Sequence, residues 1–375
     1  MRRRRILLAL GTVIVIVAGA AGAYVVTRED EGATSGVAAR PRPTTSTSST
    51  TTSSTTTTTL RDPLRGNGQP VTFAFGGDTM FEGNLRSKLL ADPNGVLAPI
   101  APVLSGADVA VVNLETAITE GGAAVPKKYN FRTPPVAIDA LRAAGVDAAT
   151  VANNHGLDFG PQGLADTLAA RAAKQYPIIG IGNNDAEAYT PYYVEIRGQR
   201  VAVIAATDVL DGEYIASWTA TPTQPGLASA KDLNVLVPIV QAWRAQADTV
   251  VVFLHWGIER QGCPSPRQQE VANALVNAGA DIVVGSHAHQ LQGGGRLGTA
   301  LVDYGLGNFV FYNEAGEYGR TGVLLVTATG RTIDSYQWVP ARIRGGVPTP
   351  FPAGPEADAE LAHWNELRGC AGLAA

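Results

Sequence analysis

Two histidines, His287 and His289, stand two residues apart, after Asp281, the apolar residues 282–284 and a Gly-Ser pair. In an extended segment or turn, alternate side chains point to the same side, so this spacing can direct both imidazoles toward one site. Imidazole is the most common metal ligand among neutral side chains. A pair of hydrogen-bonded surface histidines fits the same pattern equally well, so the rest of the chain must decide.

Four of the five histidines, namely His155, His255 and this pair, follow apolar runs rich in β-branched residues. Such runs are typical of strands that are buried on both faces. Between them lie segments with helical hydrophobic spacing, at 136–144, 161–174, 233–247 and 266–278. Alternating strands and helices predict a layered α/β domain. Because ligands of such sheets bind beyond the carboxyl ends of the strands, we expect the four histidines at one site.

Carboxylates follow two further apolar runs. Asp78 comes after the run 71–75 and two glycines, and Glu115 comes after the run 108–112 with Asn113 before it. Carboxylate oxygens suit hard divalent cations, which makes both residues candidate metal ligands. The alternative is an ordinary turn or capping role, which Asp and Asn commonly have after a strand.

The segment 153–160, Asn-Asn-His-Gly-Leu-Asp-Phe-Gly, is the most specific single motif. Asn154 can offer an amide oxygen to a metal, and His155 can donate a proton to a leaving group. Asp158 is placed to orient that imidazole by a hydrogen bond. A purely structural Asn-Asn-His turn is the competing interpretation.

A basic loop precedes the Pro-Pro dipeptide at 134–135. Its cations, Lys127, Lys128 and Arg132, could form an anion-binding rim, since Lys and Arg are the usual partners of phosphate and carboxylate groups. A solvated basic loop is the more frequent outcome of such a pattern. The segment 208–226, rich in Asp, Gly, Pro and Thr, is predicted to be a long loop near the site.

Composition limits the broad class. With 375 residues, 45% hydrophobic and 17% charged, the chain can form one large globular domain or two small ones. The formal net charge of -4 gives no sign of a nucleic-acid partner. Cys263 and Cys370 are too few for a zinc-finger pattern. In an oxidising compartment they could pair and tie the C-terminal segment to the loop after His255, but sequence alone does not supply the required geometry.

The N-terminus predicts export. Four arginines at 2–5 precede an uncharged run at 6–27, which is long enough for a transmembrane helix, with the arginines on the cytoplasmic side. The small residues at 18–23 also suit a cleaved signal peptide, but the length of the run favours an uncleaved anchor. The Ser/Thr-rich segment 29–68 is predicted to be a disordered linker. The expected division is an anchor at 1–28, this linker, a folded domain at 69–345 and a tail with a short helix at 346–375.

Taken together, the motifs resemble the CapA family, bacterial capsule synthesis proteins associated with poly-γ-glutamate. The resemblance covers about 71–339, and that family in turn resembles the calcineurin-like metallophosphoesterases. It implies a four-layer α/β/β/α sandwich, an extracytoplasmic domain on a single-pass membrane anchor, and a role with an anionic surface polymer. The segments that carry it, in chain order, are Gly77-Asp78-Thr79-Met80, Asn113-Leu114-Glu115, Phe131-Arg132, Asn153-Asn154-His155, His255-Trp256-Gly257 with Glu259, Gly285-x-His287-x-His289 and Leu306-Gly307-Asn308-Phe309.

The resemblance also implies a site. Asp78 and His289 would bind one divalent metal, Mn, Fe or Zn, and Glu115 would stand near a bridging position. A second metal would take Asn154, His255 and His287, with His155 as proton donor and Asp158 beside it. Met80 departs from the phosphoesterase pattern, which has a histidine there, and a thioether is a poor ligand for these metals. The residues expected to contact substrate are Lys127, Lys128, Arg132, Asn113, Glu259 and Asn308.

Several functions remain open at this level. The chain is expected to serve the synthesis, export or anchoring of a poly-γ-glutamate-type polymer, with capsule synthase subunits as potential partners. One alternative is a metal-dependent envelope hydrolase that cleaves a phosphoester or polymer amide. Another is a component that binds the polymer without turnover, and a weaker one is a fold whose metal is purely structural.

Overall fold

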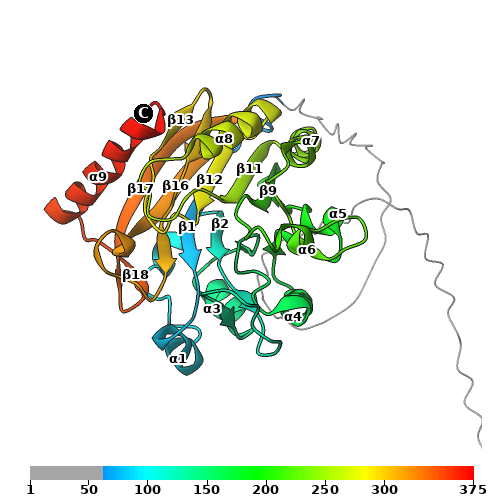
Figure 1. Cartoon of the computed structure of the whole chain (residues 1–375). Coiled ribbons are helices and arrows are strands. Elements are labelled where there is room, and N and C mark those ends of the chain that lie inside the picture. The colour runs from blue at the N-terminus through cyan, green and yellow to red at the C-terminus, as the bar shows by residue number, and fades with distance from the viewer. Residues whose placement is uncertain (1–61) are drawn as a thin grey trace, which may run out of the picture.

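The computed structural model describes residues 62–375, so the predicted anchor and most of the predicted linker lie outside the described residues. Two large sheets dominate this part of the chain (Figure 1). The first contains, in spatial order, β18 (Val347–Pro350), β17 (Thr332–Arg344), β16 (Arg320–Thr329), β1 (Val71–Thr79), β2 (Val109–Leu114), β5 (Ala148–Thr150) and β6 (Ile178–Ile179), with β15 (Asn308–Val310) also paired to β1. The second contains β13 (Gly294–Leu297), β14 (Ala300–Asp303), β12 (Ile282–Ser286), β11 (Thr249–His255), β9 (Gln199–Thr207) and β8 (Tyr192–Ile196).

The two sheets pack face to face. Alternate residues of β1 and β11 point inward, and the rings of Phe75 and Phe253 meet edge to face with centroids 6.4 Å apart. Each fully buried phenylalanine contributes about 1.5–3 kcal/mol through the area it removes from water. The two small sheets pair β3 (Ala117–Ile118) with β4 (Arg132–Thr133), and β7 (Ile181–Gly182) with β10 (Gly226–Leu227).

Helices cover the outer faces of both sheets. Leu89, Leu141 and Leu164 pack with outward side chains of β1 and β2, while Val240 and Leu275 pack with those of β9 and β11. In Figure 1 the two groups lie on opposite sides of the sheets, so the order of layers is α/β/β/α. The first group is α1 (Asn84–Ala91), α3 (Ala137–Ala143) and α4 (Gly160–Lys174), and the second is α7 (Leu233–Arg244) and α8 (Pro266–Ala278). Three short helices are α2 (Ala101–Leu104), α5 (Asp185–Ala188) and α6 (Ile215–Trp218).

The C-terminal segment is integrated with the sandwich. Strand β18 pairs with β17, so the region predicted as a tail contributes to the first sheet. The short helix expected in this tail is α9 (Pro355–Ala371), which packs along the sheet edge, where Trp364 stacks on Trp338 at 5.6 Å. Cys263 and Cys370 form a disulfide with a Cα–Cα distance of 5.7 Å, which fixes the end of α9 to the loop after β11.

Strand β13 begins with a glycine, because Gly294 pairs with Asp303 in a tightly packed position. A Cβ at Gly294 would lie 2.5 Å from the Asp303 carboxylate and 2.6 Å from Trp364, which explains the small residue. Residues 62–68, assigned to the disordered linker, contact the domain, since Gln199 Nε2 donates to the carbonyls of Arg65 and Gln69. Among residues 62–375 no helix is both long and apolar enough to cross a membrane.

Candidate metal centre

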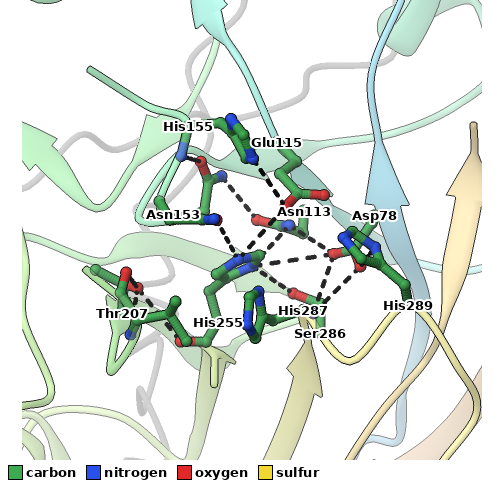
Figure 2. A network of polar contacts seen from close by, with 12 residues as sticks. Asp78, Asn113, Glu115, Asn153, His155, Thr207, His255, Ser286, His287 and His289 are labelled. Carbon is green, nitrogen blue, oxygen red and sulfur yellow. Dashed lines mark hydrogen bonds and ion pairs between the residues drawn. The ribbon is translucent and has the colours of Figure 1, made fainter. Parts of the chain in front are cut away.

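The site lies where the carboxyl ends of parallel strands from both sheets meet (Figure 2). Asp78 on β1 pairs in register with Asn113 on β2, and His255 ends β11 beside Ser286 on β12. Parallel pairing aligns the strand ends at one edge, and face-to-face packing brings the two edges together. The fold thus brings polar residues from both sheets to one site.

Glu115 stands at the middle of this cluster. Its Oε1 lies 3.5 Å from His255 Nε2 and 3.9 Å from His155 Nε2, and its side chain is fully buried. Among residues 62–375, neither carboxylate oxygen has a hydrogen-bond partner, and the same holds for His287 Nδ1. Burial, followed by the nearby Asp78 carboxylate, raises the pKa of Glu115 well above its usual range. Buried polar groups are nearly always satisfied, so unpaired ones at one point indicate a partner such as a cation.

In the described part of the chain, two overlapping groups have metal-ligand geometry, and both include Glu115. One joins Glu115 with His255 and His287, and the other joins it with Asp78 and His289. Within each group the ligand atoms lie within 4.8 Å of one another. Imidazole and carboxylate donors together suit Mn, Fe or Zn, so the residues fit the divalent metal that the resemblance implied.

The His-x-His turn is held in an unusual backbone conformation. His287 and His289 have φ angles of 96° and 55°, which L-residues rarely adopt and which cluster at functional sites. The His287 amide lies 3.2 Å from Asp78 Oδ2, and His289 Nδ1 lies 3.2 Å from the same oxygen and 2.9 Å from Asn308 Oδ1. Asp78 therefore fixes both the backbone and one imidazole of the turn.

The three imidazoles of the two candidate ligand groups differ in charge preference. Burial lowers the pKa of His287 to about 3, and neighbouring His289 adds to the effect. Burial and then His287 lower the pKa of His255 well below its usual range. For His289 burial also acts downward, but the carboxylates of Glu115 and Asp78 outweigh it and raise its pKa to about 10. Neutral imidazole is the ligating form, and these shifts keep His255 and His287 neutral near neutral pH.

Asparagine side chains set the orientation of His255. Asn113 Nδ2 donates to Asp78 Oδ1 at 2.8 Å and lies 3.2 Å from His255 Nδ1, so that nitrogen accepts. His255 Nε2–H then donates to Asn154 Oδ1 at 2.8 Å. Asn154 and His255, predicted as ligands of one metal, therefore face each other at the site.

His155 and Asp158 form the expected pair. His155 Nδ1–H donates to Asp158 Oδ2 at 2.6 Å, and the Phe131 ring stacks on the imidazole at 4.2 Å. Burial lowers the pKa of His155, although Asp158 opposes the shift. A neutral imidazole that donates through Nδ1 presents Nε2 as an acceptor. The proton-donor role predicted for His155 therefore requires that Nε2 be protonated first.

The predicted substrate-binding cations do not gather into one patch. Lys127 is only 10% exposed and binds Asp158 Oδ1 at 2.9 Å. Lys128 is exposed, with its ammonium 4.9 Å from the Tyr129 ring centroid. The guanidinium of Arg132 lies 4.8 Å from the Phe159 ring centroid. Each cation thus has a neighbour of its own within the protein.

The other residues predicted to contact substrate also lie in different environments. Asn113 and Asn308 are fully buried and hold Asp78 and His289 in place. Glu259 is exposed on the loop after β11, and its charge helps to raise the pKa of His289. Met80 is buried in the core between the first sheet and its helices, with Leu85 and Leu89, which explains why it does not serve as a ligand.

Sequence reasoning missed three residues that build the site. Asn153 Oδ1 accepts from the His155 amide at 3.1 Å, and its Nδ2 donates to Asn113 Oδ1 at 3.1 Å. Ser286 Oγ lies 3.2 Å from His255 Nδ1. Phe131 covers His155. Their positions next to Asn154, His287 and Arg132 in the motifs were the only available signal, because nothing in the sequence gives the direction of a side chain.

Fold and site together define the class of protein: an α/β sandwich with a buried imidazole and carboxylate centre suited to a divalent metal. The model of the family described as bacterial capsule synthesis protein PGA_cap matches residues 72–313. The chain belongs to this family, which confirms the resemblance that the motifs carried.

Two curated relatives agree with this assignment. The chain is 34% identical over 223 residues to the capsule biosynthesis protein CapA of Bacillus anthracis, covering 58% of this chain and 53% of that protein. It is 32% identical over 215 residues to the PGA biosynthesis protein CapA of Bacillus subtilis strain 168, covering 56% and 55%. The chain thus spans about half the length of these relatives. A hypothetical protein of known structure from Thermus thermophilus aligns with a TM-score of 0.45 and 16% identity over 72% of this chain and 99% of its own.

Proposed function

We propose that this chain is a divalent-metal protein of the bacterial cell surface that serves the synthesis, export or anchoring of an anionic polymer of the poly-γ-glutamate type. Family membership and the names of the two CapA relatives support the polymer. The apolar N-terminal run and the Ser/Thr-rich segment support a single-pass anchor that carries the folded domain outside the membrane. Capsule synthase subunits in that membrane are the proposed partners.

One observation carries the metal in this proposal. Within the described part of the chain, both oxygens of the fully buried Glu115 lack hydrogen-bond partners, and this carboxylate belongs to both groups of potential ligands. Leaving a charged group buried and unpaired costs far more than one ordinary hydrogen bond, so such an arrangement persists when a cation compensates it. Asp78, Glu115 and His289 would hold one ion, and Glu115, His255 and His287 a second.

At the chemical level we favour a metal-dependent hydrolase of a phosphoester or a polymer amide, in line with the likeness of the motifs to the calcineurin-like metallophosphoesterases. A divalent cation at this position would act as a Lewis acid toward the oxygen of the reacting group. His155 is the residue that would move the proton, because its Nε2 points to Glu115 while Asp158 holds Nδ1. Phe131 packs on the imidazole and restricts its rotation.

A second function, polymer binding without turnover, is favoured by Met80. This residue replaces a ligand of the related enzymes, and its side chain lies in the core rather than at the site. A centre short of one ligand could hold a structural ion and leave catalysis absent.

Metal content tests the centre directly. We expect purified protein from residue 62 onward to contain near-stoichiometric Mn, Fe or Zn by elemental analysis, and His287→Ala and Asp78→Ala to lower it at least about tenfold. His363→Ala is the matched control, because this partly exposed histidine contacts Glu317 on the surface and should leave the metal content unchanged. A metal-free wild type after reconstitution with each of the three metals would overturn the proposal.

The two functions are then separated by His155→Ala. Under the hydrolase proposal, cleavage of bis-p-nitrophenyl phosphate or of a γ-glutamyl polymer should fall by about 10²-fold or more while metal content stays constant. Under the binding proposal the wild type shows no cleavage, and affinity for the polymer is the same in both proteins.

A further inference from the structure

We propose that Lys127 is a positioning residue that couples the loop 208–219 to the His155–Asp158 pair, rather than a substrate-binding cation. It stands between two groups of contacts that come from distant parts of the chain. The proposal deepens the proposed function by assigning a control element to the same site, and only its kinetic test rests on that function.

The first contacts of Lys127 reach the proton-transfer pair. Its Nζ lies 2.9 Å from Asp158 Oδ1 and also donates to the backbone carbonyl of Asn154. The other oxygen of Asp158 accepts from His155 Nδ1 at 2.6 Å and from the Phe131 amide at 2.7 Å. Lys127 therefore neutralises the fully buried carboxylate that orients the imidazole.

The second contacts of Lys127 reach the loop. Asp211 Oδ2 lies 3.7 Å from Nζ, and the ammonium lies 5.4 Å from the ring centroid of the buried Trp218. Tyr214 stacks on Trp218 at 4.5 Å, and its hydroxyl lies 3.5 Å from the Pro126 carbonyl, next to Lys127. These residues lie in the loop 208–219, whose helix α6 is only four residues long.

The Lys127 ammonium therefore contacts both the proton-transfer pair and the loop. A compact point charge with three donors can satisfy Asp158, the Asn154 carbonyl and Asp211 together, while its aliphatic stem packs in the interior. If the loop moves away, Lys127 loses an acid and an aromatic partner, and the buried Asp158 is held less firmly. Loop order and the orientation of His155 should consequently change together.

Hydrogen–deuterium exchange tests this coupling without any substrate. In Lys127→Met, which keeps the length of the stem, we expect amides of both 208–219 and 153–160 to exchange at least about tenfold faster, since hydrogen bonds to charged groups are worth more than neutral ones. Lys128→Met is the matched control, because the neighbouring ammonium is exposed and lies over the Tyr129 ring, and it should change neither segment.

Asp211→Asn tests the contact of Lys127 with the loop separately from its contact with Asp158. This side chain is 49% exposed, so the variant should fold, and we expect faster exchange in 208–219 with a smaller change in 153–160. Increased exchange confined to 125–131 in Lys127→Met would overturn the proposal, as would equal effects of the Lys127 and Lys128 variants.

The kinetic test applies if the wild type hydrolyses bis-p-nitrophenyl phosphate. A positioning role predicts that Lys127→Met lowers kcat by about tenfold or more with KM unchanged, whereas a substrate-binding role raises KM and leaves kcat. An inactive wild type would count against the hydrolase but leave the exchange result to decide on Lys127.

Discussion

His255 Nε2 lies 3.5 Å from Glu115 Oε1, and the two residues come from different sheets of the sandwich. Their contact joins the carboxyl end of β11 to the residue that follows β2. Because both side chains are buried, the contact brings a carboxylate and an imidazole together out of reach of bulk water. The site therefore exists only when the two sheets are packed together.

Replacing Glu115 should have opposite effects on binding and on stability. We expect Glu115→Met to lower metal content at least about tenfold, because both groups of ligands lose a member. When a chelator keeps both proteins metal-free, the free energy of unfolding of this variant should be about 1–3 kcal/mol higher than that of the wild type. The substitution removes two buried oxygens that lack hydrogen-bond partners among the described residues. Urea unfolding measures the change. Glu120→Met, at a side chain that is 67% exposed, is the control and should shift stability by less than about 0.5 kcal/mol. A loss of stability in metal-free Glu115→Met would contradict the argument.

Asp158 should matter for turnover rather than for metal binding. In the proposed hydrolase, Asp158→Asn removes the carboxylate that holds His155 Nδ1 and is expected to lower kcat by about 10²-fold or more, with metal content unchanged. Steady-state kinetics and elemental analysis on one preparation check both parts. Asp166→Asn is a suitable comparison, because that carboxylate accepts hydrogen bonds from Gln162 and Thr119 outside the site. Equal kinetic losses in the two variants would show that the effect is structural.

The disulfide should stabilise the domain without shaping the metal centre. It closes a loop with a sequence separation of 107, so Cys370→Ser should lower the free energy of unfolding by about 2–5 kcal/mol. Metal content should stay the same, because Gln292 Nε2 independently donates to the carbonyls of Gln261 and Cys263 and holds that loop. The double variant with Cys263→Ser should lose no more stability than the single one. A fall in metal content in either variant would show that the crosslink is needed for the site.

Asp303 should give the domain a stability that falls as pH rises. Burial raises the pKa of this carboxyl from an ordinary 3.8 to about 7, although Gly305 and Trp364 donate hydrogen bonds to it. Between these values the folded protein holds a proton that the unfolded chain has released, so unfolding becomes easier with increasing pH. The free energy of unfolding of Asp303→Asn should therefore decrease less between pH 4 and pH 7 than that of the wild type, by up to a few kcal/mol.

Urea unfolding in chelator across that range measures the slope for Asp303. Glu366→Gln is the control, because Glu366 is an exposed residue of α9. This variant should keep the wild-type dependence of stability on pH. An unchanged slope in Asp303→Asn would mean that the buried carboxyl is ionised in the folded protein throughout the range.

The sequence by itself determined the elements and their order. The predicted helices at 136–144, 161–174 and 266–278 match α3, α4 and α8 to within a residue or two. Hydrophobic periodicity is local, so it survives without knowledge of the tertiary structure. The same local signal placed Asp78, Asn113 and His255 at strand ends, which was sufficient to predict that they share a site.

Tertiary structure alone decided which way the side chains point and which partners they meet. The run Lys127, Lys128 and Arg132 looks like one basic patch in sequence, yet its members contact Asp158, Tyr129 and Phe159. Met80 lies two residues after Asp78 but packs into the core on the helical side. The disulfide, with its partners far apart in the chain, likewise depended on the position of α9. Directions and long-range distances follow from how layers pack against one another, and no short stretch of sequence records that packing.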